Sequence, residues 1–230
     1  MSRVVNVARI QMVAWRSALG WPWGILAIAF TANLAIFGSM GGAPDSTTTG
    51  GLMSIYVVFF ISYIQSMTQV LPFAIGLSVS RRTFYVSTAL LAIGQSLAYG
   101  VVLYLLRLLE DASGGWGMSL EFFGIPYLVH ENPVAQVAAY SVPFLLLAFV
   151  GVFVGVLHKR WGSNGVLTLC AGVVALVGAL VFLVTWQQRW PTVGRWLVDA
   201  SPLAMVAGWP LLVTLALAAS GYILIRRTVP

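Results

Sequence analysis

The stretch VAQVAAYSVPFLLLAFVGVFVGVLHKRWGSNGVLTLCAGVVALVGALVFLVTW, residues 134–186, decides the fold. Two apolar runs, residues 134–157 and 166–186, flank a short segment that holds the only charged residues of the stretch, Lys159 and Arg160. Each run has the roughly 20 residues that a helix needs to cross the hydrocarbon core of a bilayer. Because a backbone in lipid must satisfy its hydrogen bonds internally, such runs form helices. The stretch therefore predicts two transmembrane helices joined by a turn.

Apolar runs of similar length recur along the rest of the chain. They cover, approximately, residues 21–40, 52–79, 83–109 and 208–225. Hydrophobic residues make up 60% and charged residues 8% of the 230 positions, whereas a soluble domain has roughly 25% charged residues. We therefore expect an all-α membrane protein with six transmembrane helices, in which residues 1–230 form a single transmembrane domain.

The segment before the first run, residues 2–18, has an amphipathic pattern. Arg3, Asn6, Arg9 and Arg16 fall on one side of a helical wheel, and apolar side chains fall on the other. Such a pattern is typical of a helix that lies flat in the membrane interface. We expect an N-terminal interfacial helix here.

The basic residues predict the orientation. If the N-terminus is cytoplasmic, nine of the twelve lie inside: Arg3, Arg9, Arg16, Arg81, Arg82, Lys159, Arg160, Arg226 and Arg227. The three others, Arg107, Arg189 and Arg195, lie outside with all six acidic residues. Because cytoplasmic loops carry the excess of Lys and Arg, both termini are expected in the cytoplasm of a cell whose plasma (inner) membrane holds the protein. The net charge of +6 comes from these pairs rather than from a patch, so membrane lipid and not nucleic acid is the expected partner.

The sequence offers little chemistry of its own. A P-loop needs Gly-Lys-Ser/Thr, and the sole lysine, Lys159, is followed by Arg160. His130 and His158 are predicted on opposite sides of the membrane, so they cannot share a metal ion. The predicted spans contain no ionisable residue except Arg107, which lies near an outer end. Glu110 and Asp111 follow it by three and four positions, a spacing at which either can form an ion pair with it on a helix. We expect no catalytic residues, no metal and no cofactor in this chain, which is not an enzyme by itself.

A polar stripe runs along the second span. Ser62, Gln65, Ser66 and Gln69 are spaced three, four and seven residues apart, which places them on one helical face. They line either a transport pathway or subunit interface, or they merely hold helices together through hydrogen bonds worth about 0.6 kcal/mol each. Gln95 and Tyr99 form a similar pair on the third span. Pro72 is expected to kink the second span, since proline removes a backbone donor.

Two short basic turns are predicted at the cytoplasmic surface. Leu77–Tyr85 contains Ser80, Arg81, Arg82, Phe84 and Tyr85, and the second turn contains His158, Lys159 and Arg160. The arginines either anchor the topology or form a docking surface for a cytoplasmic protein. Two GxxxG pairs, Gly20 with Gly24 and Gly151 with Gly155, are weak signals of close helix approach.

With these features the chain resembles a permease of the type-2 class of ABC transporters. The stretch LPFAIGLSVSRRTFY, residues 71–85, is similar to the Gly-x-x-x-(Ser/Thr)-Arg-Arg-x-Phe-Tyr turn of actinobacterial permeases in this class. The segments GGWG, residues 114–117, and VHENP, residues 129–133, also resemble that group. Permeases of this class resemble the chain in having a surface helix, six spans, cytoplasmic termini and an outer re-entrant segment before the sixth span.

The resemblance implies a partner-driven transporter. Two permease chains, identical or not, pair in the membrane, and two cytoplasmic nucleotide-binding ATPase subunits, which hold the ATP and Mg, dock on their loops. Ser80, Arg81, Arg82, Phe84 and Tyr85 would transmit ATP-driven closure, and Gln65, Ser66 and Gln69 would line the pathway. An exporter of a small amphiphilic, peptide, lipid or drug-like cargo is expected. An ATP-independent oligomeric channel or carrier, and an anchor or sensor subunit that transports nothing, are the alternatives.

Overall fold

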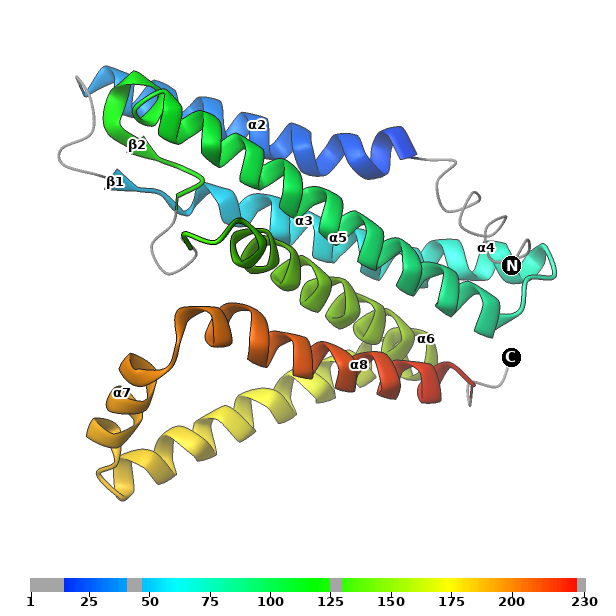
Figure 1. Ribbon diagram of the computed structural model, residues 1–230. Helices are drawn as coiled ribbons and strands as arrows, with labels where there is room; N and C mark the ends of the chain where they lie inside the picture. Colours follow the sequence, from blue (N-terminus) through cyan, green and yellow to red (C-terminus); the bar gives the residue numbers. More distant parts are fainter. Residues whose placement is uncertain (1–14, 41–46, 125–129, 227–230) are drawn as a thin grey trace.

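The computed structural model describes residues 15–40, 47–124 and 130–226, and this part of the chain is almost entirely helical (Figure 1). Five helical segments are long and apolar enough to cross a membrane: 20–39, 50–76, 81–112, 133–186 and 204–225. The all-α prediction is confirmed. Of the predicted interfacial helix, residues 2–14 lie outside the described residues, and residues 15–18 begin α2 (Trp15–Ser39).

The second span consists of several helical pieces. A short 3-10 helix (Gly50–Leu52) leads into α3 (Met53–Gln65), one wide π-helical turn η2 (Ser66–Val70) follows, and α4 (Leu71–Gly76) completes the span. Pro72 lies at the start of α4, directly after the wide turn. Irregular turns of this kind occur where proline interrupts the helical hydrogen-bond ladder, so the irregularity lies where Pro72 predicts it.

The first half of α6 (Pro133–Trp186) is the centre of the bundle. It contacts α3, α5 (Arg81–Ala112) and α8 (Trp209–Arg226), while α2 packs on α3. Tyr140, Phe144 and Val152 of this half are fully or almost fully buried. Phe144 stacks on Tyr56 of α3, with ring centroids 4.0 Å apart. The core is thus rich in aromatic side chains.

One of the two GxxxG pairs lies at a helix contact. A methyl group added at Gly151 would lie 2.7 Å from the carbonyl oxygen of Phe60, and one added at Gly155 would lie 2.5 Å from the Cβ of Met67. At Gly20 and Gly24, an added methyl group would meet nothing within 4 Å. Gly151 and Gly155 therefore allow α6 to approach α3 closely.

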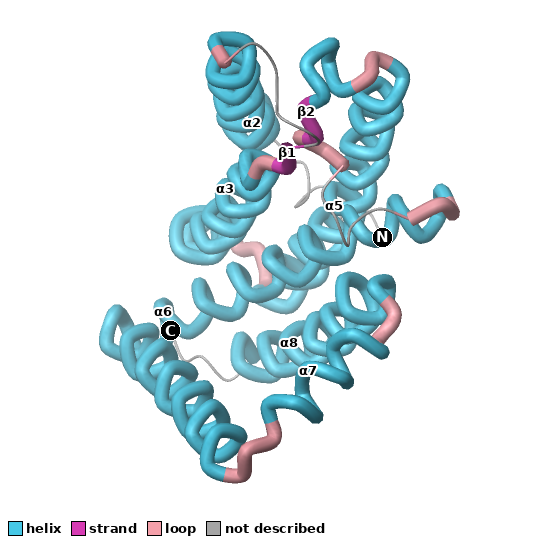
Figure 2. Tube along the Cα trace, turned by 90° about the vertical axis from the view of Figure 1, so that its left-hand side faces the viewer, coloured by secondary structure: helices cyan, strands magenta, loops and turns pink. Residues whose placement is uncertain are grey.

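A single bend at Gly162 divides α6 into two halves. Its φ of 65° and ψ of −160° are accessible to glycine and not to other residues. The prediction of a turn at His158–Trp161 is corrected here, because these four residues continue the helix and only Gly162 departs from it. Beyond the bend, residues 166–186 have no buried side chain. This half stands apart from α2, α3 and α5 and leads to α7 (Trp190–Asp199) (Figures 1 and 2).

The C-terminal end of α5 leads into the connection between α5 and α6. Gly114, Gly115, Trp116 and Gly117 all have φ between 61° and 72°, so the chain makes a left-handed turn in which three of four residues are glycine. The chain then forms β2 (Leu120–Glu121), which pairs in parallel with β1 (Thr47–Thr48). A second π-helical turn, η4 (Ala204–Gly208), precedes α8.

Candidate functional site

The polar stripe of the second span faces away from the rest of the chain. Gln65 and Gln69 are exposed, and Ser62 and Ser66 are half-buried. Tyr63 and Met67, on the other face of the same segment, are buried at 6% and 0% exposure. The polar face is therefore not used for packing within the described part of the chain.

The stripe lies near the middle of its span. The helical segment covers residues 50–76, so residue 63 is its midpoint and Gln65 lies about 3 Å from it along the helix axis. Gln69 is part of the wide turn η2, and π-helical turns are frequent at functional sites. In a bilayer spanned by this segment, both glutamines would lie at a depth where the hydrocarbon core contains no water.

The hydrogen bonds of the stripe are local. The Ser62 hydroxyl donates to the carbonyl oxygen of Val58 at 2.9 Å, one turn earlier. Among the described residues, neither the Gln65 nor the Gln69 amide forms a hydrogen bond. These amides therefore do not hold the bundle together and are available to another molecule.

Gln95 and Tyr99 lie in a different environment. The hydroxyl of Tyr63 donates to Oε1 of Gln95 at 2.7 Å, which joins α3 to α5. Tyr99 is 3% exposed, and its ring lies 5.1 Å from that of Trp23 and 5.4 Å from that of Phe144. Both residues contribute to the contacts inside the bundle, and the structure does not bring them to the face of Gln65 and Gln69.

The first basic turn divides its residues between surface and core. Ser78 has a φ of 61°, and Ser80 caps α5 by accepting a hydrogen bond from the Thr83 N–H at 3.2 Å. Ser80 and Arg82 are exposed, and Arg81 is half-buried. A partner could reach these three residues directly.

Phe84 and Tyr85, the aromatic residues of the same turn, are buried at 0% and 5% exposure. The Tyr85 hydroxyl donates to the Ala218 carbonyl oxygen of α8 at 2.7 Å, and its ring lies 5.7 Å from that of Tyr222. A methyl group at Gly221 would lie 2.9 Å from the same hydroxyl. The start of α5 is thus fastened to α8, and a displacement of the turn would reach α8 through Tyr85.

The second basic cluster, His158, Lys159 and Arg160, is fully exposed on α6 just before the bend. The guanidinium carbon of Arg160 lies 4.6 Å from the ring centroid of Trp161, within the range of a cation–π contact. The cluster therefore places positive charge at the surface, and none of its three side chains is buried.

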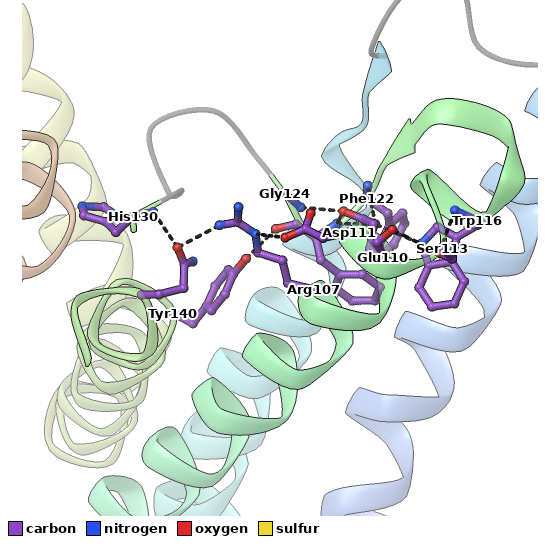
Figure 3. A network of polar contacts seen from close by, with 11 residues as sticks. Arg107, Glu110, Asp111, Ser113, Trp116, Phe122, Gly124, His130 and Tyr140 are labelled. Atoms are coloured by element: carbon purple, nitrogen blue, oxygen red, sulfur yellow. Dashed lines mark hydrogen bonds and ion pairs between the residues drawn. The ribbon is translucent and has the colours of Figure 1, made fainter. Parts of the chain in front are cut away.

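A polar network lies at the C-terminal end of α5, and the sequence predicts only its ion pairing around Arg107. The Glu110 carboxylate, 2% exposed, accepts hydrogen bonds from the Trp116 indole at 3.0 Å and from the backbone N–H groups of Phe122, Phe123 and Gly124 at 2.9–3.1 Å (Figure 3). Each of these donors follows Glu110 by 6 to 14 residues. One carboxylate thus holds the described part of the connection, as far as Gly124, to the end of α5.

Arg107 organises the other side of this network. It pairs with Asp111 at 3.5 Å and donates to Oε1 of Gln136 at 2.9 Å, which also accepts from the His130 N–H at 2.7 Å (Figure 3). The predicted Arg107–Asp111 pair is confirmed. In the structure Glu110 bonds to backbone donors instead of to Arg107, which corrects the second half of that prediction. Arg107 and Asp111 are ordinary i, i+4 neighbours, whereas no short-range pattern marks Glu110.

Within residues 15–40, 47–124 and 130–226, no three His, Cys, Asp or Glu side chains lie close enough together to hold a metal ion. The chain matches no protein-family model, no curated protein and no solved structure. The resemblance to type-2 ABC permeases therefore rests on the residues quoted for it and stays a prediction.

Proposed function

We propose that the chain is the membrane-spanning permease subunit of an ATP-driven transporter. It crosses the plasma (inner) membrane six times with both termini in the cytoplasm, pairs with a second permease chain, and is energised by separate ATPase subunits that bind ATP and Mg.

The length of α6 supports six crossings. A continuous helix of 54 residues would be about 80 Å long, against a hydrocarbon core of about 30 Å. The bend at Gly162 separates residues 133–161 from residues 163–186, and each part is long enough to cross once. An even number of crossings returns the chain to its starting side, and the excess of basic residues assigns that side to the cytoplasm.

The exposed polar stripe carries the transport proposal. Moving an amide from water into an apolar medium without a hydrogen-bond partner costs roughly 2–7 kcal/mol. Gln65 and Gln69 are exposed near the middle of a span, so lipid is a poor neighbour for both. A second permease chain across a polar pathway provides the amides with water, cargo or protein partners. The resemblance implies export of a peptide, lipid or drug-like cargo, and the lack of a large predicted outer domain favours a small amphiphilic one.

The first basic turn supports an ATPase partner. Ser80, Arg81 and Arg82 provide an accessible basic surface, and the Tyr85–Ala218 hydrogen bond links that surface to α8. ATP-driven movement of a docked subunit would then shift α5 and α8 together. The exposed cluster of His158, Lys159 and Arg160 is a second contact for the same partner.

An ATP-independent oligomeric channel or carrier is the second candidate. The stripe alone favours it, because a ring of chains around Gln65 and Gln69 would satisfy the amides without any cytoplasmic subunit.

The two proposals are separated by purifying the tagged chain from native membranes in mild detergent and identifying its partners by mass spectrometry. We expect an ATPase with P-loop and signature sequences in stoichiometric amount. The Arg81→Glu/Arg82→Glu variant should lose this ATPase, while Arg189→Glu/Arg195→Glu, with the same charge change at the opposite end of the bundle, should retain it. If the unmodified chain purifies without an ATPase and ATP leaves its transport unchanged, the channel is correct.

A further inference from the structure

An open groove of about 670 Å³ follows α6 through its bend at Gly162. This volume lies within the range of about 300–1,000 Å³ that is usual for ligand pockets. The lining extends from Leu157 to Leu176 along one helix. From Asn164 to Leu176, beyond the bend, the helix rises about 18 Å, so the groove is elongated along the helix and has the shape of a chain rather than of a compact ligand.

The polarity of the groove falls from the bend toward Leu176. Leu157 lines the groove before the bend, Trp161 and Asn164 line it at the bend, and the Thr168 hydroxyl, which donates to the Asn164 carbonyl oxygen at 2.8 Å, lies next along it. From Leu169 to Leu176 the lining consists only of glycine and aliphatic residues. An amphiphile with a polar end near Trp161 and an apolar tail toward Leu176 matches this order.

Three basic side chains lie in the helical turn before Trp161, although none of them lines the groove itself. His158, Lys159 and Arg160 are exposed within one turn of Trp161, and the guanidinium of Arg160 lies over the Trp161 ring at 4.6 Å. Within the described residues, none of these three side chains forms an ion pair with a carboxylate. The charge at this end is therefore not neutralised locally and is complementary to an anionic head group.

We propose that this groove binds one anionic phospholipid of the cytoplasmic leaflet. Its phosphate lies against Arg160, whose guanidinium contacts the lining residue Trp161, and Lys159 adds positive charge within the same turn. Its glycerol and ester region lies near Trp161 and Asn164, and one acyl chain follows the groove toward Leu176. Basic pockets at the cytoplasmic side of membrane helices are suited to such head groups, and Trp is enriched at this interface. The assignment to the cytoplasmic leaflet rests on the orientation proposed above, whereas the binding itself needs only the groove and its basic end.

The lipid would have a structural consequence for a span that has few other contacts. Residues 166–186 bury no side chain in the described part of the chain. A bound acyl chain would fill the concave side of the bend and hold the two halves of α6 at a fixed angle. Lipid composition would then influence how far the second half diverges from α8.

The test is native mass spectrometry of the purified chain titrated with palmitoyl-oleoyl phosphatidylglycerol or with the phosphatidylcholine of the same chains. Each basic residue near an anionic head group contributes about a fivefold factor, so Lys159→Gln/Arg160→Gln should weaken phosphatidylglycerol binding about 30-fold. The matched control, Arg189→Gln/Arg195→Gln, removes the same charge at the opposite end of the bundle and should have no such effect.

A second pair of variants tests the groove itself. An added side chain at Gly172 or Gly178 meets nothing within 4 Å, but only Gly172 lines the groove. Gly172→Leu should therefore weaken the binding of both lipids, and Gly178→Leu should not. Equal affinity of the unmodified chain for the two lipids would overturn the proposal. So would a Gly172→Leu variant that changes the oligomeric state and leaves lipid binding intact, because the groove would then be an interface between chains.

These measurements use the isolated chain and need neither an ATPase nor a cargo. Phosphatidylglycerol binding that is lost in Lys159→Gln/Arg160→Gln supports the lipid site even if no ATPase co-purifies. The leaflet is read separately from a Ser163→Cys variant in a Cys170→Ser background, and labelling by an impermeant maleimide from outside intact cells would overturn the cytoplasmic assignment.

Discussion

Substitution of both glycines at the α3–α6 contact, Gly151→Ala/Gly155→Ala, tests the close packing at the centre of the bundle. At Gly155 the new methyl carbon would lie 2.5 Å from the Cβ of Met67, and at Gly151 it would lie 2.7 Å from a backbone carbonyl oxygen. Neither neighbour can rotate away, because a Cβ and a carbonyl are fixed to the backbone. The two helices would have to separate by about 1 Å to restore ordinary contact.

The expected cost follows from two opposing effects. Overpacking costs roughly 1–3 kcal/mol at each site, and alanine in place of a helical glycine returns up to about 1 kcal/mol. For two sites these terms span a net cost of about 0–6 kcal/mol, and we expect the double variant to lower the free energy of unfolding by about 3 kcal/mol, the middle of this range, which corresponds to a fall in Tm of about 6–12 °C for a chain of this size.

The second GxxxG pair is a matched control. Gly20→Ala/Gly24→Ala makes the same chemical change at the same spacing, where an added methyl group meets nothing within 4 Å. Both variants are unfolded with SDS in mixed micelles and by heating, with tryptophan fluorescence as the readout. A Gly151→Ala/Gly155→Ala variant as stable as the unmodified chain, or a control destabilised as strongly, would refute the argument from close approach.

Three further outcomes are expected. Glu110→Gln should lower the free energy of unfolding by about 2–3 kcal/mol, because the NH2 group of the new amide would face backbone N–H groups, which are donors as well. The control Asp111→Asn should lower it by less than about 1 kcal/mol. Hydrogen exchange of the connection after α5 measures the effect of both variants. Gln65→Leu/Gln69→Leu should alter transport in proteoliposomes and leave assembly intact, and unchanged transport of every cargo tested would reduce the stripe to a packing feature. Tyr85→Phe removes the hydrogen bond to α8, so the amount of cargo moved per ATP hydrolysed should fall while the ATPase still co-purifies. An unchanged amount of cargo per ATP would show that this hydrogen bond does not transmit movement from the turn to α8.

The sequence predicts the features that depend on local patterns. Apolar runs indicate the helices, Pro72 marks the irregular turn, and the i, i+4 spacing of Arg107 and Asp111 produces an ion pair. Each of these follows from the periodicity or the chemistry of neighbouring residues. The GxxxG spacing of Gly151 and Gly155 also marks a true contact, but the identical spacing of Gly20 and Gly24 does not. Small residues permit close approach without specifying the helix that approaches.

The features that escaped prediction depend on contacts between distant residues or on one dihedral angle. The role of Glu110 requires that Phe122 and Gly124 return to the end of α5, and nothing in the residues near Glu110 indicates this return. The basic segment before Gly162 remains helical because polar side chains at the membrane surface do not interrupt backbone hydrogen bonds. Only the φ of Gly162 breaks the helix, so the bend lies just after the basic residues at which the sequence predicts the turn.

Two kinds of exposed surface in this chain have different physical requirements. Most aliphatic side chains of residues 166–186 are exposed and none is buried, and lipid acyl chains cover such a surface without cost. Gln65 and Gln69 are exposed as well, but a hydrocarbon neighbour leaves their amides without hydrogen bonds, at roughly 2–7 kcal/mol each. Only this face therefore requires water, cargo or a second protein surface. A transporter would meet this requirement along its pathway, whereas an anchor or sensor that transports nothing would meet it only at an interface with another protein. If Gln65→Leu/Gln69→Leu raised the free energy of unfolding and left transport unchanged, the face would be neither a pathway nor an interface.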